Sequence, residues 1–201
     1  MIEVYAITDH PAPPLADTEA LAAGTLAAVC APAGVGQVSP EALWRHEQVV
    51  EALMEAADVL PVRYGMRFDD PTAVRAVVER RHDELVAALN RVRGAIELSV
   101  RVVADGAPSH SSTPASGTEY LRAKSRGALV ARAVHEPLSE LARATVSRHP
   151  RRPGKVLTAA YLVDRGAASD FAQRVARIQD AHPELRLLCT GPWPPYSFAE
   201  P

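Results

Sequence analysis

The feature that most constrains this chain is a proline-rich segment near its end, residues 190–198, which reads Thr-Gly-Pro-Trp-Pro-Pro-Tyr-Ser-Phe. Its prolines remove backbone hydrogen-bond donors and fix φ near about −65°, so the segment cannot form a helix or a central strand and must run extended. Large aromatic rings seldom lie without a surface beneath them. We therefore expect Trp193 and Tyr196 to dock, either on this chain's own domain as a strap or in an aromatic-lined groove of another protein. Because the segment directly follows an apolar strand, we favour the strap.

The bulk properties exclude several classes of protein. A chain of 201 residues can form one domain or two small ones, and its net charge of −2 provides no field for binding nucleic acid or an anionic membrane. No apolar run is long enough to span a bilayer, and the first residues lack the pattern of a signal peptide. The two cysteines, Cys30 and Cys189, lie in short apolar segments without ligand spacing, which is typical of reduced, buried thiols. The chain is expected to be cytoplasmic.

The first half of the sequence alternates short apolar runs with helical patterns. A serine at 39 and an aspartate at 70, each followed by proline, are typical of helix starts, and Gly94 is placed to end the second helix. On the first helix, Leu43, Val50 and Met54 recur on one face. The expected elements are strands at 2–8 and 26–31, a helix after 39, a strand at 59–64 interrupted by Pro61, a helix over 70–94, and a strand at 96–102 with one solvated face.

The second half begins with a segment rich in Gly, Pro, Ser and Thr at 105–117, which is expected to be a loop or linker. A helical region over 118–149 follows, kinked or divided by Pro137, and then a basic turn at 148–154. The last elements are a strand at 155–163, a helix at 169–182 and a strand at 185–189, which form a right-handed β-α-β unit if the two strands are parallel neighbours. The prediction is an α+β fold with an N-terminal domain at 1–104, a linker at 105–117, and a C-terminal domain at 118–201 that includes the tail at 190–201.

No set of residues has the spacing of a catalytic, cofactor-binding or metal site. The histidines are widely separated, and His46 lacks the second histidine that a zinc-protease helix carries four positions on, because that position is Val50. We expect His46 to be a hydrogen-bonded residue near the apolar face of its helix. The Gly-Val-Gly at 34–36 lacks the third glycine of a dinucleotide-binding loop and is interpreted as a turn. We assign no catalytic residue, cofactor, metal ligand or partner-binding residue, and expect the protein not to be an enzyme.

Landmarks along the whole chain resemble one family. The most specific is the tail, and the others occur in the same order as in the family: Val4-Tyr5-Ala6-Ile7, the helix at 46–51, Val59-Leu60-Pro61-Val62-Arg63-Tyr64-Gly65, Gly117-Thr118-Glu119-Tyr120-Leu121 and Tyr161-Leu162-Val163-Asp164-Arg165. This ordered set resembles the GvpL/GvpF family of gas vesicle proteins. The sequence departs from the family pattern at Tyr64, Met66 and Arg67, where a Phe-Gly-Thr run is more usual. The resemblance implies two α+β domains, the second similar to a ferredoxin-like fold.

The resemblance also implies a function. The protein is expected to be an accessory or minor structural component of gas vesicles that binds the small hydrophobic shell protein, acts with other accessory proteins and assists formation of the wall. Such a shell subunit would aggregate unless its apolar surface were covered before assembly. The strands at 59–64 and 96–102 are the candidate surfaces for this contact. The alternative is a small-molecule-binding enzyme or sensor on a ferredoxin-like scaffold, which requires a pocket of convergent polar groups.

Overall fold

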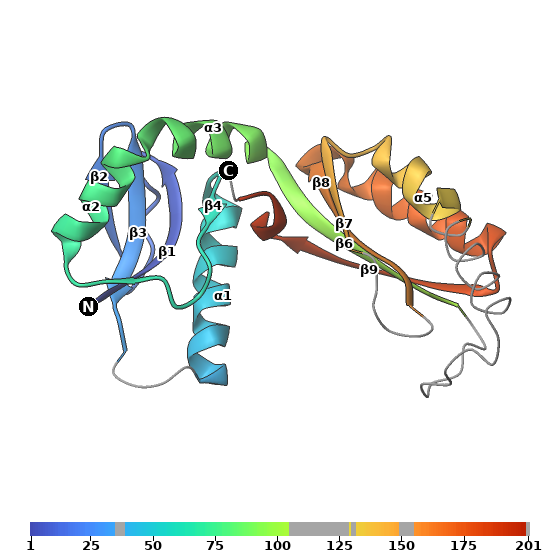
Figure 1. The fold of residues 1–201 in the computed structure, drawn as a ribbon, viewed down its shortest axis with the longest axis horizontal. Helices are drawn as coiled ribbons and strands as arrows, with labels where there is room; N and C mark the ends of the chain where they lie inside the picture. Colours follow the sequence, from blue (N-terminus) through green and yellow to red (C-terminus); the bar gives the residue numbers. More distant parts are fainter. Residues whose placement is uncertain (35–38, 105–128, 130–131, 149–154, 200–201) are drawn as a thin grey trace, which may run out of the picture. The chain divides into compact units, whose positions relative to one another are not determined.

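The structure is a computed structural model that describes residues 1–34, 39–104, 129, 132–148 and 155–199 (Figure 1). The chain divides into two compact units. The first comprises Met1–Ala95 and the segment that begins at Trp193, and the second comprises Ile96–Pro192. The fold is α+β, as predicted. The division differs from the predicted boundaries, because the strand at 96–102 belongs to the second unit and the end of the tail to the first.

The first unit is built on a sheet whose strand order is β2-β3-β1-β4, with β5 also paired to β1. β1 is antiparallel to β3, β4 and β5, and β2 is antiparallel to β3. β2 was not predicted; it forms a hairpin with β3 through a tight turn at Gly24, whose φ of +65° suits glycine. The strands are β1 (Ile2–Asp9), β2 (Glu19–Ala23), β3 (Leu26–Pro32), β4 (Leu60–Pro61) and β5 (Arg67–Phe68).

Three helices complete this unit: α1 (Pro40–Ala56), α2 (Pro71–Arg80) and α3 (His82–Val92). The predicted caps are present, since the Ala42 N–H donates to Ser39 Oγ at 3.2 Å and the Ala73 N–H donates to Asp70 Oδ1 at 2.8 Å. The prediction of one helix over 70–94 was wrong. At Arg81 the backbone leaves helical values, with φ −106° and ψ 17°, so that α2 packs against β2 and β3 while α3 packs against β1 and β4.

Both faces of this sheet are covered. Tyr5 of β1 and Ala31 of β3 pack against Val50 of α1, whereas α2 lies against β2 and β3 on the other face (Figure 1). Successive residues along β1 and β3 are therefore buried, instead of alternating between core and solvent.

The second unit contains a sheet of four strands in the order β7-β8-β6-β9. Helical residues 132–139 lie between β6 and β7 in the chain, and α5 lies between β8 and β9. This order of elements and strands is that of a ferredoxin-like arrangement. The elements are β6 (Ala95–Ala104), β7 (Ala144–Arg148), β8 (Lys155–Asp164), a 3₁₀ turn (Arg165–Ala167), α5 (Ala168–Ala181) and β9 (Leu185–Trp193).

One prediction for this unit was wrong. The helix expected over 118–149 ends before β7, whose Thr145 and Val146 pair antiparallel with Tyr161 and Ala160 of β8. β-branched residues at these positions suit a strand, and tertiary pairing decides the outcome. The β-α-β unit of β8, α5 and β9 was expected to be right-handed if its two strands were parallel neighbours; this condition is not met, because β6 lies between them. The predicted linker at 105–117 and most of the basic turn at 148–154 lie outside the described residues.

The helices of the second unit cover one face of its sheet. Tyr161 of β8 is fully buried and contacts Phe171 of α5, with ring centroids 5.1 Å apart. The Tyr161 hydroxyl also shares a 2.9 Å hydrogen bond with Nδ1 of His135, which lies in the helical segment 132–139. Because one residue contacts both helices, the two helices share a face of the sheet (Figure 1).

Candidate partner-binding surface

The side chains considered from the sequence as nucleophiles or metal ligands, namely the two cysteines and His46, are buried or half-buried in the structure. Within the described part of the chain, no group of three or more His, Cys, Asp or Glu side chains could hold a metal ion. Cys30 is buried, and burial raises the pKa of its thiol to about 11, so the nucleophilic thiolate is scarce at neutral pH. Cys189 is half-buried, and burial raises the pKa of its thiol as well.

His46 connects three parts of the first unit. Its Nε2 donates a hydrogen bond of 2.8 Å to the Val62 carbonyl, and its Nδ1 lies 3.1 Å from Oε1 of Glu3 on β1. A carbonyl can only accept, so one proton resides on Nε2 and a second lies between Nδ1 and the Glu3 carboxyl group. The rings of Tyr5 and Tyr64 enclose the imidazole at centroid distances of 5.0 and 5.5 Å. With its side chain fully buried, His46 is the hydrogen-bonded helix residue that the sequence predicted.

The end of the tail lies on the first unit. Pro194, Pro195 and Phe198 are buried, and the guanidinium group of Arg91 on α3 donates two hydrogen bonds, of 3.3 and 2.9 Å, to the Phe198 carbonyl. Tyr196 packs against the core cluster that includes Val50 of α1. We call residues 194–198 the C-terminal strap. It includes a short 3₁₀ turn, Tyr196–Phe198.

The surroundings of the Tyr196 hydroxyl are unusual. The oxygen is buried without a hydrogen bond of good geometry, and the carboxylates of Glu47 and, more weakly, Glu51 of α1 act on it. Burial and these carboxylates raise the pKa of Tyr196, while burial raises the pKa of Glu47. Trp193, which was expected to dock with Tyr196, is instead 41% exposed at the end of β9.

The two strands expected to contact a partner are placed differently: β4 is an edge strand of its sheet with both residues buried, whereas β6 is an interior strand. Of residues 59–64, only Leu60 and Pro61 form a strand; both are buried and pair with β1. The strand at 96–102 lies within β6, which is flanked by β8 and β9 and has no free edge. The prediction that one face of this strand is solvated was also wrong in part, because Glu97 is buried.

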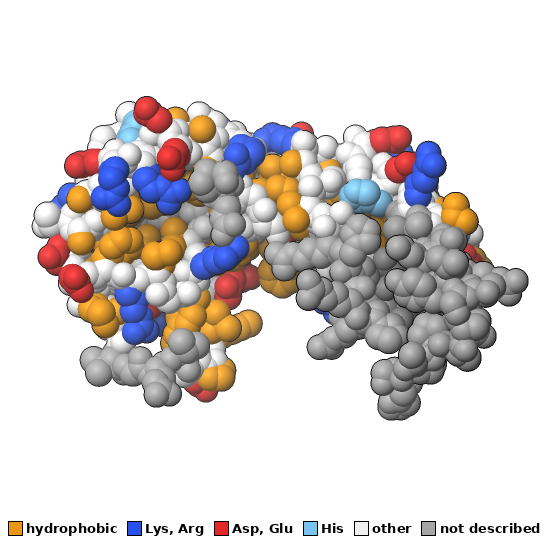
Figure 2. Space-filling model, in the orientation of Figure 1, with side chains coloured by type: hydrophobic (Ala, Val, Ile, Leu, Met, Phe, Trp, Pro, Cys, Tyr) orange, Lys and Arg blue, Asp and Glu red, His pale blue; other side chains and the backbone are white. Residues whose placement is uncertain are grey.

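The exposed apolar residues of the first unit include two neighbours at the start of α1. Leu43 is 43% exposed and Trp44 is 66% exposed, and hydrophobic side chains gather where this helix begins (Figure 2). Leu43 shares a helical face with His46 and Val50, but it lies one turn nearer the helix start and is not buried there. The sequence therefore predicted the helical face of Leu43 but not its exposure. The sequence prediction did not include Trp44 as a candidate surface residue. A tryptophan next to the apolar face of a predicted helix is the feature that could have indicated it.

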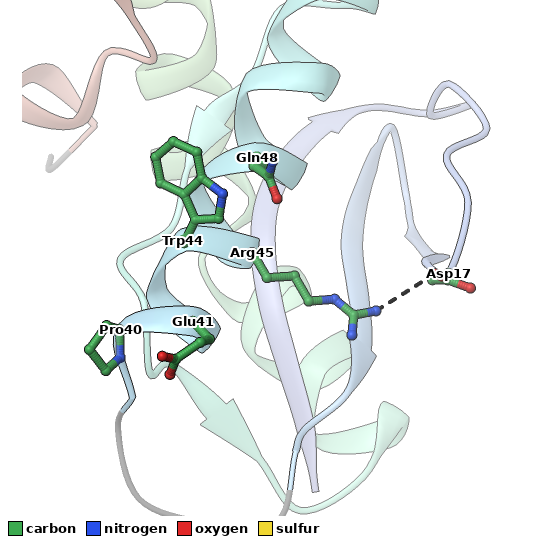
Figure 3. A pocket seen from close by; sticks show the side chains of 6 residues that line it. All are labelled: Asp17, Pro40, Glu41, Trp44, Arg45 and Gln48. Atoms are coloured by element: carbon green, nitrogen blue, oxygen red, sulfur yellow. Dashed lines mark ion pairs between the residues drawn. The ribbon is translucent and has the colours of Figure 1, made fainter.

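A hollow of about 630 Å³ adjoins Trp44 (Figure 3). Arg45 extends across one side of it to form an ion pair of 3.7 Å with Asp17, which lies in the segment before β2. Glu41 is exposed in the first turn of α1, where hydrogen bonds to its own backbone and to Ser39 lower the pKa of its carboxyl group. We define the α1 surface as Leu43 together with the six residues that line the hollow: Asp17, Pro40, Glu41, Trp44, Arg45 and Gln48.

The chain is similar to gas vesicle proteins over nearly its whole length. The family described as "Gas vesicle synthesis protein GvpL/GvpF" matches residues 4–200. Gas vesicle protein L of a Streptomyces strain is 35% identical and covers 77% of this chain and 67% of that protein. Gas vesicle protein F2 of Halobacterium salinarum is 26% identical and covers 77% of this chain and 66% of that protein. The chain thus spans about two thirds of the length of these relatives.

Crystal structures show the same fold. Those of GvpF from Microcystis aeruginosa and from Anabaena superpose with TM-scores of 0.81 and 0.85, at 19% and 20% identity. They match 100% of this chain and 99% and 96% of the two solved chains. The chain belongs to the GvpL/GvpF family, and its role is related to gas vesicles. None of the helices that the structure describes is long and apolar enough to cross a membrane.

Proposed function

We propose that this protein is a non-enzymatic accessory or minor structural component of gas vesicles, which binds the small hydrophobic shell protein and assists formation of the wall. It acts in the cytoplasm and at the growing vesicle, together with other accessory proteins. Family membership supports the gas vesicle role. The observation that carries the binding role is the α1 surface, where the consecutive residues Leu43 and Trp44 are both exposed. Exposed apolar groups rimmed by polar ones are typical of protein-binding surfaces.

The chemistry of the partner explains why a protein is needed that keeps the shell protein from aggregating. A subunit that forms a gas-facing apolar wall exposes hydrophobic surface until it is assembled, and such surface aggregates in water. A protein that covers it needs an apolar contact surface and no catalytic group. The alternative function, a small-molecule enzyme or sensor, needs an enclosed pocket with convergent polar groups. The hollow on α1 is open, and the charged groups of Arg45 and Asp17 in it are paired with each other.

Co-expression with the shell protein tests this function. The shell protein alone, and the shell protein with this chain, are separated into soluble and insoluble fractions, and the soluble complex is captured through a tag on this chain. We expect the shell protein to be soluble and captured only when this chain is present. If it is neither captured nor kept soluble, with the other accessory proteins present as well as absent, direct binding of the shell protein is wrong.

A further inference from the structure

We propose that the α1 surface receives a basic side chain carried on an apolar segment of the partner. This inference rests on the proposed function, in which the partner is the shell protein, and it adds where that protein binds and which chemistry is recognised. The occupant is a segment that presents a lysine or arginine between apolar residues. The basic side chain lies on the indole of Trp44 beside the Glu41 carboxylate, and the apolar neighbours cover Leu43.

The spacing of the residues builds one continuous site. Trp44 and Arg45 each lie three or four positions from both Glu41 and Gln48, so the four residues lie on one face of α1. Figure 3 shows Trp44 and Glu41 on one side of this face and Arg45 directed away from them, toward Asp17. The hollow that these side chains line is about 630 Å³ and is open to solvent.

The charges of α1 favour a basic partner. Around Trp44 the helix carries three glutamates, at 41, 47 and 51, against a single arginine, Arg45. The positive charge of Arg45 is directed to Asp17, and Glu41 supplies a carboxylate of the α1 surface three positions before Trp44, which is neighbour spacing on a helix. The positive end of the helix dipole does not reverse this preference, because the Ser39 hydroxyl caps the helix and Glu41 is placed in its first turn.

Trp44 supplies the second requirement. Trp44 is 66% exposed, so much of its side chain is open to a ligand. Cations are attracted to the face of tryptophan more strongly than to other aromatic rings, and the attraction grows as the site loses water. Leu43, the preceding residue, is 43% exposed and adds apolar area at the start of the helix. A site with an open indole, a nearby carboxylate and an apolar neighbour matches a basic residue in an apolar sequence better than an acidic or a purely apolar segment.

Four variants test the inference in the full chain, with the shell protein as probe. Trp44→Ala removes the ring and Glu41→Lys reverses the charge beside it. Glu55→Lys makes the same reversal on the same helix, about 20 Å away by the helical rise. Leu188→Ala removes an apolar side chain that is 54% exposed on β9 of the second unit. All four sites are exposed, and thermal unfolding measured by circular dichroism checks that the variants fold.

We expect Trp44→Ala and Glu41→Lys each to weaken binding of the shell protein about tenfold. Glu55→Lys and Leu188→Ala should change it by less than about twofold, and added salt should weaken the wild type more than Glu41→Lys. If the wild type binds and the first two variants bind equally well, the inference is wrong while the proposed function stands. It is also wrong if Glu55→Lys costs as much as Glu41→Lys, because the effect is then general charge. If the wild type does not bind the shell protein, the proposed function fails and the inference fails with it.

Discussion

Removal of the Phe198 ring is the sharpest test of the C-terminal strap. Phe198 is only 6% exposed, and truncation of a buried phenylalanine to alanine typically costs about 3–5 kcal/mol. We expect Phe198→Ala to fall at the lower end, about 3 kcal/mol, because the short strap can move to fill part of the space. The first unit has roughly 100 residues, a size for which 1 kcal/mol shifts Tm by at least about 4 °C. Its Tm should therefore fall by about 12 °C.

Differential scanning calorimetry of the full chain measures this shift, with two matched controls. Phe198→Leu keeps most of the apolar volume and should cost less than about 1.5 kcal/mol. Leu188→Ala removes a side chain that is 54% exposed and should change stability by less than about 0.5 kcal/mol. If Phe198→Ala melts at the wild-type temperature, the strap adds nothing to the fold. The tail would then be better explained as an adaptor for a partner's groove, in which case its removal abolishes binding and leaves stability unchanged.

Three further predictions concern single groups. His46→Ala should lower the free energy of unfolding by about 3–5 kcal/mol, because it leaves the Glu3 carboxyl group buried without its partner; urea denaturation measures the loss, and adding Glu3→Gln should recover part of it. Hydrogen bonds from Arg93 lower the pKa of Asp9 from its usual 3.8, so Asp9 contributes stability that is present above about pH 4 and is lost as the pH falls through its folded pKa. Arg93→Ala should therefore reduce the loss of stability between about pH 6 and pH 3, and an unchanged pH profile would contradict this. Cys30, with a pKa of about 11, should be alkylated by iodoacetamide at about pH 8 much more slowly in the folded protein than in urea, and equal rates would show that the thiol is not buried.

Much of the fold could be predicted because local signals and tertiary packing agree. The Ser39 and Asp70 caps, each followed by proline, mark the starts of α1 and α2, and β1 is a clear β-rich run. The signals fail where pairing decides the structure. β2 is largely alanine and forms a strand because it pairs with β3. β7 lies within the region 118–149, whose sequence pattern predicted a helix.

The candidate surface was harder to predict than the fold. The sequence placed possible contacts on the strands at 59–64 and 96–102, because edge strands are common binding elements. Whether a strand is at an edge depends on the order of strands in the sheet, and β6 is an interior strand. Periodicity placed Leu43 on the same face of α1 as the buried Val50. It does not show how much of that face, toward the start of the helix, is covered by the rest of the unit. The exposure of Trp44 is likewise a property of the folded unit and not of its sequence.

The return of the chain to the first unit has a consequence for synthesis. Proteins emerge from the ribosome at about 5–20 residues per second, and the 97 residues from Ile96 to Pro192 separate the two parts of this unit, so roughly 5–20 s pass between them. During that interval the core around Val50 lacks Tyr196, and Arg91 lacks the Phe198 carbonyl. The unit whose residues are made first is therefore the last to be complete.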